Sequence, residues 1–177
     1  NDREISAEMT RYLYSLGHER IAFIKGNPDH RAVGNRFRGY CEGLEQSGLK
    51  FSEQLVVEGD NSIGSGEAAA MKLLTRKRRP TAIFAANDDM AAGVIRVADR
   101  LGIDVPEQLS VAGCDDIALA QQINPALTTI NQPLKAMAER ATRSIIEMIR
   151  TGRIENDSVI IPATIVVRES TGPAPVE

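Results

Sequence analysis

Five short apolar runs recur along this chain, and each one ends in polar side chains. The runs are Ile21 to Ile24, Leu55 to Val57, Ala82 to Ala86, Leu109 to Ala112 and Thr128 to Ile130. They start roughly 30 residues apart, the length of a βαβ unit, and amphipathic segments separate them. This alternation predicts an α/β fold of three layers (α/β/α), in which helices cover both faces of a parallel sheet.

Apolar positions spaced three and four residues apart predict the helices between these runs. The predicted helices cover residues 5–16 and 33–44, a segment that ends near 74, and residues 91–101 and 134–149. Residues 117–123 are predicted to form an irregular loop. The chain is expected to finish with two strands, Val159 to Ile161 and Ile165 to Val167, and with a frayed tail from Gly172.

Composition narrows the possible functions. The 177 residues suit one domain or slightly more, and a net charge of −3 gives no general attraction to phosphate backbones, so this piece is not expected to bind DNA. Cys41 and Cys114 lack the spacing of a zinc site, and we expect neither a metal nor a cofactor. No segment has the length of a membrane span or the pattern of a signal peptide, so a cytoplasmic location is expected. Because the chain opens on Asn1 without methionine, further residues are expected to precede it.

The carboxyl ends of parallel strands meet at one edge of a sheet, and ligands bind in the crevice outside that edge. The five polar clusters are therefore expected to line one binding crevice. Asn87 follows a predicted strand and is expected to contact a ligand. Its neighbours Asp88 and Asp89 are instead expected to cap the following helix.

Two further strand-end groups suit hydroxyl recognition. Of Asp115 and Asp116, one carboxylate is expected to face the crevice and accept hydrogen bonds from a vicinal diol, while the other holds the loop. The alternative is an aspartyl nucleophile or a magnesium site. Arg36, which lies about one and a half turns into the second predicted helix, is expected to donate two hydrogen bonds to a bound hydroxyl or carboxylate, the alternative being a solvated helix arginine. His30 is as well explained by an exposed loop position as by ligand contact.

Several strings in register resemble the LacI family of bacterial transcription regulators, and the match runs from Asn1 to about Thr171. The strings are Leu16 to Ile24, Arg36 to Tyr40, Arg79 to Gly93, Val105 to Ile117 and Leu127 to Pro133. The resemblance implies a Rossmann-like effector domain of the type I periplasmic binding protein kind, with two similar α/β subdomains. It also implies an N-terminal helix-turn-helix that binds operator DNA.

By this resemblance the chain is mainly the second subdomain, without the DNA-binding head and without nearly all of the first subdomain. Residues 1–133 would form the second subdomain, residues 134–161 a return helix and strand packed with the first subdomain, residues 162–171 a final strand of the second subdomain, and residues 172–177 a tail. Without those neighbours, the apolar face of the long helix needs another partner. We expect that partner to be a second copy of the chain or the retained sheet.

The resemblance also implies effector contacts and partners. The contacts carried over by position are His30, Arg36, Asn61, Asn87, Asp115 and Gln132. Asn61 departs from the pattern, because many relatives place there an aromatic residue that stacks on the ligand. The implied partners are a sugar or sugar derivative, a second copy in a homodimer, and operator DNA through the missing head, with no membrane. The implied activity is sensing rather than catalysis; the alternatives are a periplasmic sugar-binding protein and an α/β enzyme that uses Asp115.

Overall fold

Six strands form one sheet in this computed structural model, which describes residues 1–152 and 159–176. In chain order they are β1 (Ile21–Lys25), β2 (Val56–Glu58), β3 (Ala82–Ala85), β4 (Ser110–Asp115), β5 (Thr128–Asn131) and β6 (Thr164–Val166). Their spatial order is β2-β1-β3-β4-β5-β6. The first five strands pair in parallel, and β6 runs antiparallel to β5. The predicted parallel α/β sheet is confirmed.

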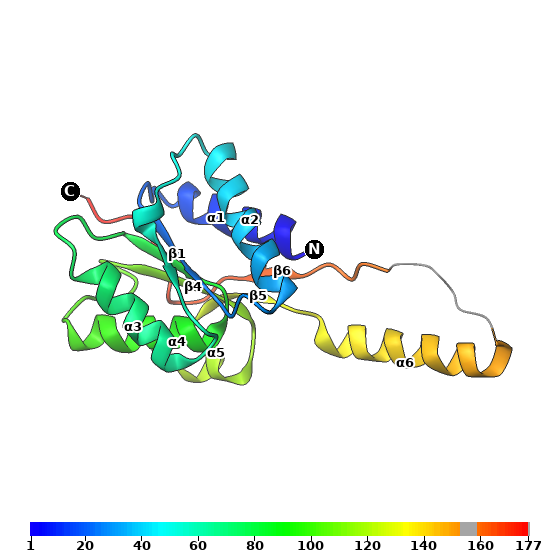
Figure 1. Ribbon diagram of the computed structural model, residues 1–177. Helices are drawn as coiled ribbons and strands as arrows, with labels where there is room; N and C mark the ends of the chain where they lie inside the picture. The colour runs from blue at the N-terminus through cyan, green and yellow to red at the C-terminus, as the bar shows by residue number, and fades with distance from the viewer. Residues whose placement is uncertain (153–158, 177) are drawn as a thin grey trace.

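Helices cover both faces of the sheet (Figure 1). One layer holds α1 (Asp2–Ser15) and α2 (Arg31–Gln46), and the other holds α3 (Ile63–Leu74), α4 (Asp88–Arg100) and α5 (Ala118–Gln122). A short 3-10 helix, Glu53–Leu55, precedes β2. The irregular loop predicted for residues 117–123 is wrong, because α5 forms there and buries Ala120. A helix of five residues is too short to show helical periodicity in the sequence.

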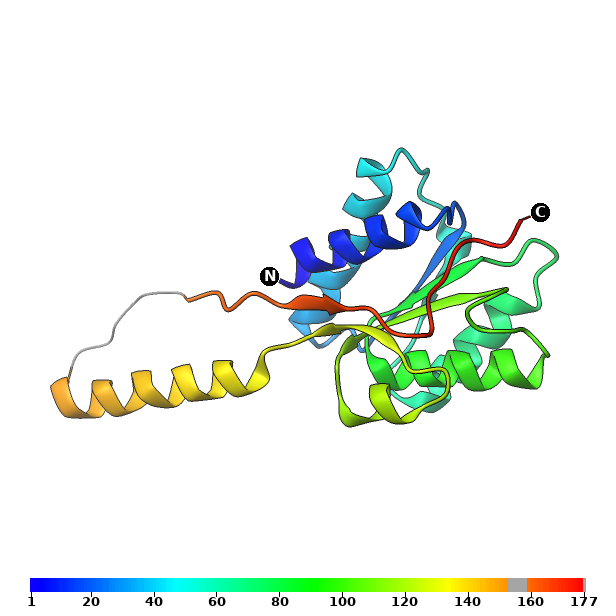
Figure 2. The same cartoon turned by 180° about the vertical axis from the view of Figure 1, so that it is seen from behind.

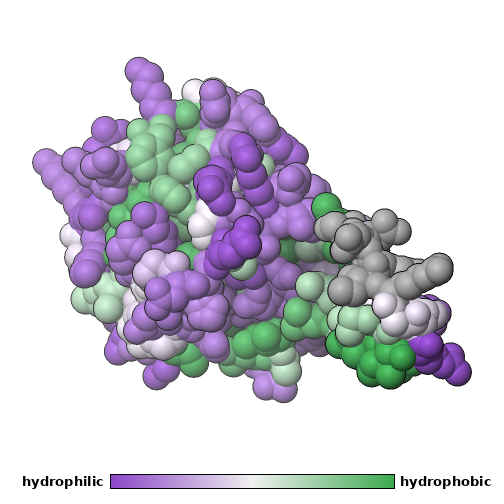
Figure 3. Space-filling view, turned by 45° about the vertical axis from the view of Figure 1, so that its right-hand side comes forward, coloured by the Kyte–Doolittle hydropathy of each residue, from purple (hydrophilic) through white to green (hydrophobic). Residues whose placement is uncertain are grey.

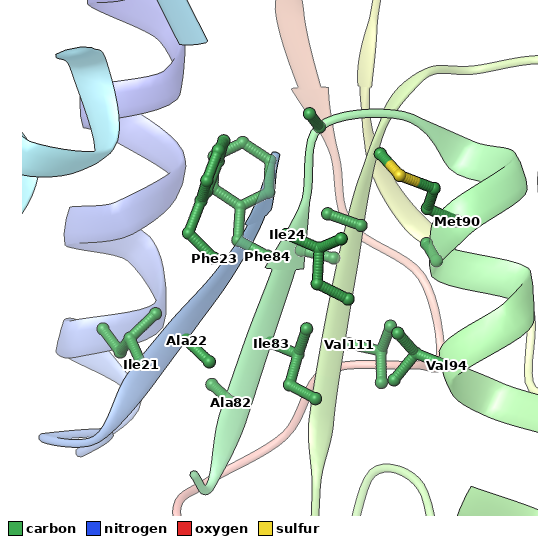
Figure 4. Close-up of a cluster of buried hydrophobic side chains, with 14 of the residues drawn as sticks. Ile21, Ala22, Phe23, Ile24, Ala82, Ile83, Phe84, Met90, Val94 and Val111 are labelled. Carbon is green, nitrogen blue, oxygen red and sulfur yellow. The ribbon is translucent and has the colours of Figure 1, made fainter. Parts of the chain in front are cut away.

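The core lies between the sheet and both helical layers (Figure 4). Phe23 and Phe84 are cross-strand partners on one face, with ring centroids 5.2 Å apart in an edge-to-face arrangement. Ile83 and Val111 pair on the face toward α4, beside Val94. Every residue of β3 is buried. Coverage on both faces explains why the strands are continuous apolar runs rather than alternating ones.

The two helices of the first layer pack closely because α2 presents a glycine to α1. A Cβ added at Gly39 would overlap the backbone carbonyl oxygen of Arg3 and the side chain of Ser6. Gly34, in the same helix, has no neighbour within 4 Å of such a Cβ. Gly39 is therefore needed for the contact between helices, whereas Gly34 is not.

This difference gives a matched pair of variants. Gly39→Ala should lower the free energy of unfolding by about 1 to 3 kcal/mol, because an overpacked helix contact must move apart. Gly34→Ala should raise it by about 0.5 to 1 kcal/mol, because alanine is the better helix former. Urea denaturation followed by circular dichroism measures both values. Equal effects of the two substitutions would contradict the packing described for α1 and α2.

The end of the chain is anchored rather than frayed, so that prediction is wrong. Ser170 and Thr171 are buried, and the amide of Ala174 donates a hydrogen bond to the carbonyl of Leu16, with 2.8 Å between N and O. The buried ring of His18 contacts the carbonyl oxygen of Gly172, at 3.1 Å from Nε2. Burial lowers the pKa of His18. Its glycine and two prolines suggested a free tail, because the polar contacts that hold this segment leave no apolar pattern in the sequence.

A long helix, α6 (Leu134–Thr151), extends away from the sheet (Figures 1 and 2). None of its residues is buried, and apolar side chains show on its surface in Figure 3. The expectation that this helix packs onto the retained sheet is wrong. Val159 to Ile161 form no strand, because they have no strand neighbour to pair with. Residues 153–158 of the predicted return segment and residue 177 of the predicted tail lie outside the described residues.

Candidate functional site

The polar side chains that follow the strands meet at the carboxyl edge of the sheet, as predicted. After β1, the amide of Asn27 donates to Oδ1 of Asn61, which follows β2, at 3.2 Å. After β3, Nδ2 of Asn87 donates to the carbonyl oxygen of Asn61 at 2.9 Å. The strand order reverses between β1 and β3, and ligands of doubly wound folds bind at such a switch point.

Arg36 connects several parts of this edge. From α2, its Nη1 donates to the carbonyl oxygen of Ala86 at the end of β3, at 2.5 Å. Its Nη2 donates to Oδ1 of Asp115, the last residue of β4, at 2.9 Å, and its Nε donates to Oδ1 of Asp2 at 3.1 Å. Arg36 is only 8% exposed, so it is not the solvated helix arginine of the alternative interpretation. A buried guanidinium needs such partners, because an unpaired buried charge is strongly unfavourable.

The two aspartates at the carboxyl end of β4 have different partners, and ligand contact by Asp115 stays a prediction. Asp115 meets Arg36, and its side chain is 31% exposed. Asp116 is 9% exposed and accepts from Arg168 at 2.6 Å and from Nδ2 of Asn131 at 2.7 Å. Both aspartates have positive φ angles, 121° and 53°. Such backbone strain in non-glycine residues persists only where surrounding contacts fix it, as Arg168 and Asn131 do here.

The prediction that Asp88 and Asp89 cap α4 is wrong. Asn87, not Asp88 or Asp89, caps the helix, because its Oδ1 accepts from the amide of Met90 at 3.1 Å. Asp88 turns inward and accepts hydrogen bonds from the amide of Ile117, at 2.9 Å, and from Thr129. Ligand contact by Asn87 stays a prediction.

The remaining predicted residues differ in their surroundings. Gln132 follows β5, and its Nε2 donates to Asp2 at 3.2 Å. Asn61 has a positive φ of 74°, and its side-chain oxygen lies where a Cβ on Gly26 would be, so a larger residue at position 26 would displace that side chain. His30 is exposed at the start of α2, and its side chain forms no hydrogen bond that caps the helix. Asp2 therefore joins Arg36 to Gln132, and Arg36 also binds Asp115. Asn61 is bonded to Asn87, and His30 lies apart.

An open groove runs along this edge toward α6. Its volume is about 500 Å³, and the sheet contributes Asp115, Asp116, Asn131 and Gln132 to its lining. Lys135 and Glu139 of α6 line the other side. Within residues 1–152 and 159–176, no group of three or more His, Cys, Asp or Glu side chains is placed to hold a metal ion. No helix in the same ranges has the length and hydropathy to cross a membrane.

Two residues of the site gave no sequence signal. Asp2 starts α1 and follows no strand, yet its carboxylate accepts from both Arg36 and Gln132. Arg168 follows β6 and reaches back to Asp116. Both contacts join residues far apart in the chain, so neither periodicity nor spacing could have found them.

Burial changes the acidity of the carboxylates at this edge. Burial raises the pKa of Asp88 to about 6, although the hydrogen bonds from Thr129 and Ile117 oppose the shift. Burial also raises the pKa of Asp115, and Arg36 counteracts that change. The folded protein therefore binds the Asp88 proton more tightly than the unfolded chain does.

The Asp88 shift predicts a pH dependence of stability. Between about pH 4 and about pH 6, the folded state holds more protons than the unfolded state, so this contribution to stability is full at the lower pH and is lost as the pH rises. Asp88→Asn replaces the titrating carboxyl group by an amide of nearly the same size and shape. Relative to the original chain, the variant should gain at most about 3 kcal/mol of unfolding free energy over that range. Parallel urea unfolding at both pH values checks this, and identical pH slopes would contradict it.

Comparison with known proteins identifies relatives of nearly the whole chain. Residues 10–171 match the family model described as the periplasmic binding protein-like domain. The chain is 36% identical over 165 residues to the HTH-type transcriptional repressor PurR of Erwinia tasmaniensis, covering 93% of this chain and 48% of that protein. The chain thus spans about half the length of the curated relatives it matches.

Two solved structures with the same fold are named as transcriptional regulators. The CelR-cellobiose complex has a TM-score of 0.90 and 35% sequence identity, and covers 96% of this chain and 52% of that chain. A LacI family regulator from Enterococcus faecium with bound ribose has a TM-score of 0.91 and 26% identity, and covers 98% of this chain and 64% of that one. These matches confirm the resemblance to the LacI family. The matched proteins are named as a transcriptional repressor and as transcriptional regulators, and not as transport proteins.

Proposed function

We propose a function that starts from an established point: this chain belongs to the periplasmic binding protein-like domain family. We infer that it is the effector-sensing portion of a cytoplasmic transcriptional regulator and has no catalytic activity. The observation that carries the proposal is the cluster around Arg36, where a buried guanidinium is held beside a partly exposed carboxylate, Asp115, at the switch point of the sheet.

A sugar or sugar derivative is the ligand class that this cluster fits best. Asp115 accepts a hydrogen bond from Arg36 and, as a partly exposed carboxylate, can accept further ones from ligand hydroxyls, while Gln132 and Asn87 add amide groups at neighbouring strand ends. Hydrogen bonds to charged groups are worth about 1.5 to 3 kcal/mol each, more than neutral ones. The solved relatives named with cellobiose and with ribose support this class.

The exposed apolar face of α6 supports the proposal that this chain contains only part of the ligand-binding cleft. Leu134, Ile145 and Ile149 are 57%, 54% and 75% exposed. Burying one such side chain stabilises a fold by about 1.5 to 3 kcal/mol, so this face needs a partner. We propose that the return segment 134–161 packs with a first subdomain outside the chain, whose presence completes the cleft.

Regulation then follows from differential affinity. An effector that bridges two subdomains favours the closed arrangement, and it shifts DNA binding only by as much as it prefers that state. In a homodimer, closure would change the spacing of two DNA-reading heads, which must match operator half-sites about 34 Å apart. Operator DNA would be bound by the heads and not by this chain.

Sugar binding by the full-length protein tests the proposal. A panel of neutral mono- and disaccharides should contain at least one that raises the melting temperature, since a ligand that binds only the folded state stabilises it. Asp115→Asn should weaken that binding by about 10- to 100-fold, because it removes a charged acceptor. Calorimetry measures the dissociation constants.

Asp99→Asn is the matched control for this experiment. Asp99 lies near the C-terminal end of α4, loses the same charge and is exposed. The control should bind the sugar as the original protein does. If Asp115→Asn bound every effective sugar with unchanged affinity, the proposed site would be wrong.

A further inference from the structure

The guanidinium of Arg36 is shared between two carboxylates. Asp115 lies 2.9 Å from Nη2 and Asp2 lies 3.1 Å from Nε, measured to Oδ1 in both residues. The third contact of Arg36 is the neutral carbonyl of Ala86. One positive charge thus faces two negative charges, and the cluster carries a net negative charge when both carboxylates are ionised.

Asp2 is held in this position by its surroundings. The Oδ1 atom that accepts from Arg36 also accepts from Gln132 Nε2 at 3.2 Å. The preceding residue is fixed as well, because Oδ1 of Asn1 accepts from the amide of Ala163 at 3.0 Å. A small cavity of about 160 Å³ is lined by Asn1, Asp2 and Gln132, and Gln132 also lines the larger groove beside Asp115. Asp2 is therefore accessible from the small cavity, which adjoins the groove at Gln132, and its side chain is 24% exposed.

The neighbouring charged residues do not neutralise the net negative charge of this cluster. Asp116 is paired with Arg168, so this pair is neutral. Lys135 and Glu139 line the groove together with opposite charges. Among the described residues, Arg36 is the one cation within salt-bridge distance of Asp2 or Asp115. An anionic ligand would have to displace a carboxylate from Arg36 or lie next to one.

We infer that Asp2 is a specificity-determining residue that makes this site select neutral or cationic hydroxyl-bearing ligands and reject phosphorylated or carboxylated ones. The inference rests on the proposed function, since it names the ligand class of the same site. Unit charges about 5 Å apart interact by several kcal/mol at the effective dielectric of a protein surface, enough to exclude an anion. Specificity of this kind comes from a repulsive group against the wrong ligand as well as from contacts to the right one.

Inorganic phosphate is the probe that isolates the effect of Asp2. Phosphate would be titrated into this chain while the Nε–H resonance of Arg36 is followed by nuclear magnetic resonance. In Asp2→Asn, phosphate should bind at Arg36 at least about tenfold more tightly than in the original chain, because one repelling charge is gone. Glu4→Gln is the control, because Glu4 lies in the same turn of α1, loses the same charge and is exposed. It should behave as the original chain does.

Two results would overturn the inference. One is phosphate binding at Arg36 of the original chain with the affinity found for Asp2→Asn. The other is no phosphate binding in Asp2→Asn, because Asp2 would then not be the group that excludes anions. This titration needs no sugar, so its outcome is separate from that of the sugar panel. In the full-length protein, the preference for glucose over glucose 6-phosphate should fall by about tenfold in Asp2→Asn, and an unchanged preference would also contradict the inference.

Discussion

The buried guanidinium of Arg36 is the interaction on which the organisation of the carboxyl edge depends. It joins α2 to the end of β3, to the turn after β4 and to the start of α1. These segments are distant in the chain and come together only because β1, β3 and β4 lie side by side in parallel. With the positive charge in place, two carboxylates can be partly buried beside each other. Without it, they would repel each other in a medium that screens charge poorly.

The opposite edge of the sheet has a different role. There the chain end is fastened by buried polar contacts, with His18 bound to Ser110 at 2.9 Å and Thr128 bound to Thr171 at 2.9 Å. No groove-lining residue of the candidate site takes part in these contacts. The amino edge thus stabilises the fold, while the strained turns at Asn61, Asp115 and Asp116 are confined to the carboxyl edge. Strain in non-glycine residues commonly marks the part of a fold that binds ligands.

The sequence contains enough to predict the sheet and the edge where polar residues gather, because the strands are apolar runs and parallel strands point the same way. It also predicts that one of Asp115 and Asp116 holds the loop, as Asp116 does through Arg168 and Asn131. It does not show that Asn87 caps α4 or that Asp2 reaches Arg36, because these depend on side-chain direction and on contacts across the fold. The strand predicted at Val159 to Ile161 does not form. An apolar, β-branched run makes no strand when no neighbouring strand is present to pair with it.

The central claim is that side chains from the ends of several strands form one ligand site around Arg36. A crystal structure of the full-length protein bound to a sugar from the panel tests this most directly. The account predicts that ligand hydroxyls lie within hydrogen-bonding distance of Arg36 and Asp115, in the groove that Gln132 also lines. A sugar bound elsewhere, with the Arg36 cluster unchanged and in contact only with protein atoms, would contradict it.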